Sequence, residues 1–102
     1  MSRARFADLI QRQLELFEHE QAALIADCEH AERAYDAADR EEAEERYSEY
    51  LDLVETGTDV LADLRDNFAM TMDEEAAEEY EETFNRAVAA RLPRFALEIE
   101  NS

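Results

Sequence analysis

The histidines are the first residues in this chain that could bind a metal or act in catalysis. His19 and His30 are 11 residues apart, so within one helix they would be separated by roughly 16 Å along its axis. A single helix therefore cannot bring both to one metal ion. Asp27 and His30 have the spacing of a carboxylate–histidine ligand pair, but a di-iron site needs a second such pair. No third histidine exists, and we predict no metal site.

Cys28 is the only cysteine. A reactive thiolate needs a cationic and partly exposed setting, whereas Cys28 falls among apolar residues at helical spacing, where a free cysteine acts as a small core residue. We therefore predict an inert, buried thiol. A single cysteine excludes a disulfide within the chain and gives no reason to expect an oxidising compartment, so the cytoplasm is the expected location.

Acidic residues number 28, and no pair of them stands out from the rest. Acid–base catalysis requires two carboxyl groups whose pKa values are separated inside a pocket, which a narrow helical core seldom encloses. With one glycine in the chain, a glycine-rich phosphate loop is also excluded. We predict no enzymatic activity, no catalytic residue and no cofactor.

The composition indicates helices as the elements that position these groups. The chain has 102 residues, one glycine and one proline, which leaves little material for hairpins or strand turns. Alanine, glutamate, leucine and arginine dominate, and all four favour helix. At this length we expect one all-α domain over residues 1–102.

Apolar residues recur at steps of three and four from Ala7 to Tyr35 and again from Ala43 to Phe68. This period predicts helices over residues 3–37 and 40–70. The phase changes near Asp39, where we expect a turn and an N-cap. It is kept on both sides of Gly57, so we expect the second helix to continue through this glycine.

The third helix is predicted over residues 73–92. Thr71 to Glu74 has the form of a capping box, and Pro93 removes a backbone donor and so ends the helix. A short turn or helix over 94–99 follows. Together these elements predict an antiparallel up-down-up three-helix bundle. Leu9 and Leu16 form a second apolar stripe on the first helix, so this helix should pack on two neighbours. A monomeric three-helix bundle would satisfy this, and so would a homodimer that completes a larger bundle, which we favour.

The net charge is −18, with ten arginines and no lysine. Such a charge repels nucleic acids and anionic membranes, and no apolar run approaches the ~18 residues of a membrane span. The arginines gather near the two ends of the chain. In an up-down-up bundle, Arg3 and Arg5 are predicted beside the acidic run 73–82. At the opposite end, Arg91 and Arg94 are predicted to approach the start of the second helix, at Glu41, Glu42, Glu44 and Glu45.

The favoured hypothesis is a small non-enzymatic acidic helical protein-interaction module, an adaptor or regulator, which self-associates and binds a basic protein partner. One alternative is an acidic decoy that imitates nucleic acid toward a basic protein. A less favoured alternative is a metal-binding bundle similar to the ferritin-like proteins. The predicted interaction surface consists of Glu74, Glu75, Glu78, Glu79, Tyr80, Glu81, Glu82, Leu9 and Leu16.

Overall fold

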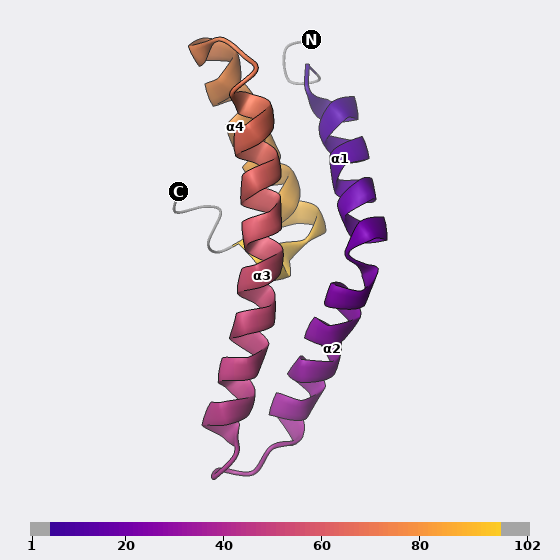
Figure 1. Cartoon of the computed structure of the whole chain (residues 1–102), viewed down its shortest axis with the longest axis vertical. Helices are drawn as coiled ribbons and strands as arrows, with labels where there is room; N and C mark the ends of the chain where they lie inside the picture. Colours follow the sequence, from indigo (N-terminus) through magenta and orange to yellow (C-terminus); the bar gives the residue numbers. More distant parts are fainter. Residues whose placement is uncertain (1–4, 97–102) are drawn as a thin grey trace.

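The computed structural model describes residues 5–96, which consist of helices and short connections (Figure 1). The elements are α1 (Ala7–Glu20), α2 (Ala22–Ala37), α3 (Ala43–Ala69), α4 (Glu74–Arg91) and the short 3-10 helix η2 (Pro93–Phe95). These residues contain no strand, which confirms the all-α prediction. None of their helices is long and apolar enough to cross a membrane.

The helix predicted over residues 3–37 is two helices, α1 and α2, divided at Gln21. The backbone of Gln21 has φ −107° and ψ 26°, outside the α-helical region. Its amide still donates to the Phe17 carbonyl at 2.8 Å, and its carbonyl accepts from Ile25 at 2.9 Å. The chain therefore bends here without reversing. The bend separates two packing contacts, since α1 packs on α4 and α2 packs on α3.

The two turns are held by aspartates. Asp39 Oδ1 accepts a hydrogen bond from the Glu42 amide at 3.0 Å, the interaction expected of an N-cap, and α3 begins just after it. At the next turn the cap is Asp73, whose Oδ1 accepts from the Ala76 amide at 2.8 Å. The predicted capping box at Thr71 is therefore wrong. The Thr71 hydroxyl instead donates to the Phe68 carbonyl at 2.7 Å, at the end of α3.

The chain runs along α1 and α2 in one direction, returns along α3, and turns again into α4 (Figure 1). α3 has 27 residues and α4 has 18, so they are about 40 Å and 27 Å long. α4 ends near the middle of α3. This gives a three-helix half (α1, α4 and the C-terminal part of α3) and a two-helix half (α2 and the N-terminal part of α3).

The core lies mainly in the three-helix half. α1, α4 and η2 supply most of the buried side chains, whereas α2 supplies only Cys28 among the residues that the structure describes. The largest side chains that are almost completely buried are Tyr80, Phe84, Phe95, Ile10, Leu14 and Leu61.

η2 closes this core by packing Phe95 on Gly57. α3 runs without interruption through Gly57, and a Cβ atom placed on this glycine would lie 2.9 Å from Phe95 Cδ1. The Phe95 ring also contacts Phe17 edge to face, with 5.7 Å between centroids. The predicted segment 94–99 thus begins as η2, while residues 97–99 lie outside the described residues. The absence of a side chain at position 57 is what allows the ring to approach α3.

Candidate interaction surfaces

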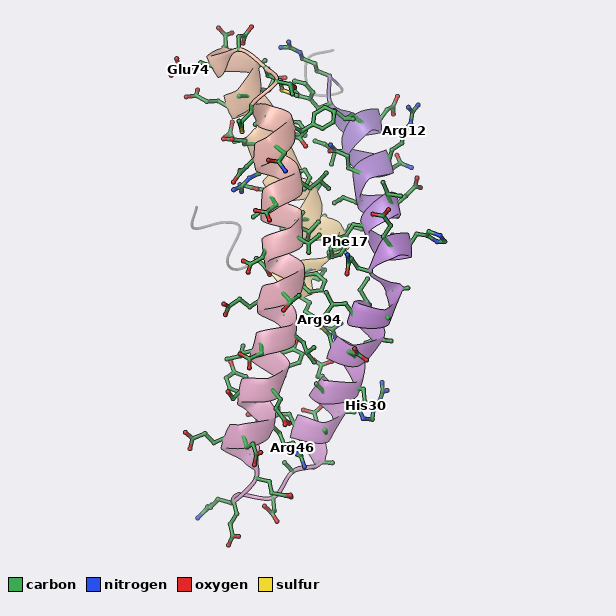
Figure 2. The ribbon with its side chains drawn as sticks, in the orientation of Figure 1. Arg12, Phe17, His30, Arg46, Glu74 and Arg94 are labelled. Carbon is green, nitrogen blue, oxygen red and sulfur yellow. The ribbon has the colours of Figure 1, made fainter. Side chains whose placement is uncertain are left out.

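The histidines are exposed on different helices, His19 on α1 and His30 on α2. Figure 2 labels His30 on α2. Over residues 5–96, no group of three or more His, Cys, Asp or Glu side chains is arranged to hold a metal ion. The arrangement of these residues offers no observation in favour of the ferritin-like alternative.

Cys28 belongs to α2, and its side chain is completely buried. Burial raises the pKa of the Cys28 thiol, because the thiolate would lose its hydration. The Arg94 guanidinium acts in the opposite direction and is outweighed. The thiol therefore keeps its proton at neutral pH, as a core residue does.

We expect the native protein to protect Cys28 from thiol reagents. Labelling at about pH 8 should be on the order of 100-fold slower than in the unfolded chain, because the helices around the thiol must open first. The reaction can be followed by the absorbance of a released aryl thiolate, with the chain in concentrated urea as the reference. Equal rates in the native and unfolded protein would contradict this burial.

Tyr80 does not belong to the predicted interaction surface, because it is completely buried. Its hydroxyl donates to Gln13 Oε1 at 2.8 Å, and its ring centroid lies 5.5 Å from that of Phe6 and 5.8 Å from that of Phe84. The helical phase of α4 explains this, since Tyr80 shares one face with Phe84 and Val88. Tyr80 is therefore a core residue.

The acidic residues around Tyr80 differ in exposure. Glu79 and Glu81 are partly buried, whereas the exposed ones are Glu74, Glu75, Glu78 and Glu82. Arg5 Nη1 lies 3.6 Å from Glu79 Oε1, which places Arg5 beside this acidic run as predicted, whereas Arg3 lies outside the described residues. Glu74 and Glu75 occupy the first turn of α4, where negative charge is favoured by the helix dipole. A binding role for these acids stays a prediction.

Arg91 and Arg94 do not approach the start of α3, and this prediction is wrong. Arg91 donates to Glu18 on α1 through Nη2 at 2.8 Å, and Arg94 donates to Glu32 on α2 through Nη2 at 3.0 Å. Because α4 covers only part of α3, its end lies beside the α1–α2 bend rather than beside residues 41–45.

A groove lies between α1 and the C-terminal part of α3. It encloses a cavity of about 130 Å³. We call it the α1/α3 groove; its lining residues are Gln13, Leu16, Phe17, Glu20, Gln21, Val60 and Leu64. Leu16 is 54% exposed. Leu9 is partly buried about two turns earlier on α1 and does not line the groove. Of the two predicted leucines, only Leu16 therefore lies at this mainly apolar surface.

α3 also carries a stripe of residues, at steps of three and four, that changes from buried to exposed along the helix. Its buried members are Thr58, Leu61, Arg65 and Ala69, Val54 is partly buried, and its exposed members are Tyr47 and Leu51. The Thr58 hydroxyl donates to the Phe95 carbonyl at 3.3 Å. Arg65 Nη1 donates to Asn85 Oδ1 at 3.0 Å. η2 and α4 therefore cover the buried part of the stripe, while Tyr47 and Leu51 remain 45% and 42% exposed.

The exposed part of this stripe belongs to a surface that we call the α2/α3 face: Glu32 and Tyr35 of α2 with Tyr47, Tyr50 and Leu51 of α3. The rings of Tyr35 and Tyr47 contact each other across the two helices, with 5.2 Å between centroids. Arg94 of η2, labelled in Figure 2, reaches this face, where it donates to Tyr50 of α3 and Glu32 of α2. Neither the α1/α3 groove nor the α2/α3 face was predicted as a whole, because each joins residues that are far apart in the sequence.

A comparison with known protein families, curated proteins and solved structures finds no match to this chain. Its function has to be argued from the two surfaces themselves.

Proposed function

We propose that this chain is a non-enzymatic protein-interaction module of adaptor or regulatory type, and that it binds a second copy of itself through the α1/α3 groove. The observation that supports this proposal is Leu16, a large aliphatic side chain that is 54% exposed beside a cavity of about 130 Å³. A cavity of roughly 150 Å³ admits a ring as large as benzene. The groove therefore has room for an aliphatic side chain from a partner.

A second copy is the favoured occupant because the groove carries little charge. Among its lining residues only Glu20 is ionised, although the whole chain has a net charge of −18. Two such copies repel each other, and this repulsion is least costly where the contact surfaces are nearly neutral. A two-fold axis beside Leu16 would let each copy present this side chain to the groove of the other, as a self-complementary interface requires.

The proposed setting is the cytoplasm, since a buried, protonated Cys28 needs no oxidising compartment. An adaptor role also agrees with the remaining surface, where acidic side chains are exposed and available to other proteins.

Light scattering of the purified protein tests this proposal. We expect the mass of a dimer at about 0.1 mM chain, and a dimer that tightens between about 50 and 500 mM NaCl, because salt screens the repulsion between copies. Leu16→Glu would place a charge in each groove, and we expect this variant to be monomeric. Circular dichroism should show an unchanged helix content, since the side chain is mostly exposed.

Leu51→Glu is the matched control, because Leu51 is a leucine of similar exposure on another surface. This variant should keep the dimer. A monomeric wild-type protein at every salt concentration would refute the proposal, and so would a dimer that survives Leu16→Glu.

A further inference from the structure

The α2/α3 face has the features of a site for a helix that continues the line of α4. In the three-helix half, α4 and η2 cover one side of α3. In the two-helix half, the same side of α3 exposes Tyr47 and Leu51. A helix packed on these residues would extend the three-helix arrangement over the whole length of α3.

The edges of this face are acidic. By helical phase, the side chains that border it project from both helices, and all of them are exposed: Glu29, Glu32 and Asp36 on α2, and Glu44 and Glu55 on α3. Among the described residues, the cation that the structure places on this face is Arg94. An occupant would therefore gain most if it carried positive charge on both sides of an apolar stripe.

Arg94 shows how the face holds a cation. Its guanidinium lies 5.9 Å from the ring centroid of Tyr50, and its Nε donates to the Tyr50 hydroxyl at 3.1 Å. Its Nη2 donates to Glu32 Oε1 at 3.0 Å. The Tyr50 ring and the Glu32 carboxylate thus both bind Arg94. Further tyrosine and acidic side chains, Tyr47, Tyr35 and Asp36, lie along the same face.

We infer that the α2/α3 face binds a basic amphipathic helix of a partner protein. The helix would place leucine-like side chains on Tyr47 and Leu51 and arginine or lysine side chains beside the bordering acids. The uncovered part of α3, residues 43–56, is roughly 21 Å long, so a helix of about 14 residues would fill it. This inference extends the proposed interaction role, but it does not depend on the α1/α3 groove.

Two other candidate occupants of the α2/α3 face match its acidic borders less well. A second copy of the chain would bring two acidic borders together. Residues 97–102, which follow the end of η2, contain Glu98 and Glu100 and no basic residue. A basic helix is the occupant that neutralises the face.

Fluorescence anisotropy with the full chain tests the inference. The probe is a labelled 14-residue helical peptide with leucine at every third or fourth position and arginine on both flanks. We expect saturable binding that weakens at least tenfold between about 50 and 300 mM NaCl, because the contacts are partly ionic. A peptide of the same composition with its leucines scattered around the helix should bind at least tenfold more weakly.

Two matched variants locate the site. Leu51→Asn should weaken binding of the peptide at least tenfold, whereas Leu16→Asn should leave it unchanged. The inference is refuted if the scattered peptide binds equally well, which would indicate unspecific attraction to an acidic chain. It is also refuted if Leu51→Asn leaves the affinity unchanged. Light scattering of the same variants measures self-association separately from peptide binding. If Leu51→Asn converted a dimer to a monomer, the α2/α3 face would be the contact between two copies of the chain instead.

Discussion

Truncation of Phe95 to alanine is expected to lower the free energy of unfolding by about 3–5 kcal/mol. The Phe95 ring is only 2% exposed and lies against Gly57 and Phe17. Its removal would leave a cavity at the junction of α1, α3 and η2. Since small domains are stable by roughly 5–15 kcal/mol, this loss is a large part of the total. Urea unfolding followed by far-ultraviolet circular dichroism measures it.

Gly57→Ala provides the control that assigns this loss to the ring contact. Alanine favours helix over glycine by about 1 kcal/mol, but its Cβ would collide with the Phe95 ring, and overpacking typically costs about 1–3 kcal/mol. We expect Gly57→Ala to destabilise the wild type and to stabilise the Phe95→Ala variant. Additive effects of the two substitutions would contradict the contact.

Replacement of Tyr80 with alanine should destabilise the protein by about 3–5 kcal/mol, because the ring occupies the centre of the three-helix half. Tyr80→Phe keeps the ring and removes only the hydroxyl. We expect it to cost about 1–3 kcal/mol, since Gln13 Oε1 would lose its donor while Gln13 Nε2 has no partner in the part of the chain that the structure describes. Both unfolding free energies come from urea titrations near neutral pH.

The Tyr80 hydroxyl also predicts a dependence of stability on pH. Burial raises the pKa of Tyr80 in the folded state above its ordinary value near 10. The stabilisation is therefore fully present below about pH 10 and is lost as the pH rises through the higher pKa of the folded protein. The difference in unfolding free energy between the wild type and Tyr80→Phe should shrink between about pH 8 and pH 11. A constant difference would contradict the burial of the hydroxyl.

Helical spacing was enough to predict much of the fold. The steps of three and four residues indicated the helices, and they placed Cys28 in the core, because burial follows the phase of a helix. By the same phase, Tyr80 shares a helix face with the apolar Phe84 and Val88. Tyr80 was predicted to be part of the interaction surface because glutamates surround it in the sequence. Its position on the helix was the better guide, since the side chain is buried.

The bend at Gln21 could not be predicted from local sequence. Neither glycine nor proline marks it, and it falls between two segments that pack on different helices, α1 on α4 and α2 on α3. The positions of Arg91 and Arg94, in contrast, could have been predicted by length alone. The predicted third helix, residues 73–92, was already shorter than the second, residues 40–70, so its end could not reach the start of its neighbour.

The α1/α3 groove and the α2/α3 face required tertiary structure, since each depends on where α4 stops. Leu16 and Leu51 are ordinary helical leucines in the sequence. Only the arrangement of the helices shows that the first lies beside a cavity and the second on an uncovered part of α3.

One half of the molecule contains three helices and the other contains two, which implies that the cooperativity of unfolding is not uniform along the molecule. The three-helix half holds most of the buried side chains, so we expect it to unfold only in the global transition. The end of the α2–α3 hairpin has fewer buried side chains to resist local opening. That end is free to fray while α1, α4 and η2 stay assembled. A partner bound there would order only part of the chain, and some of its binding free energy would be spent on that ordering.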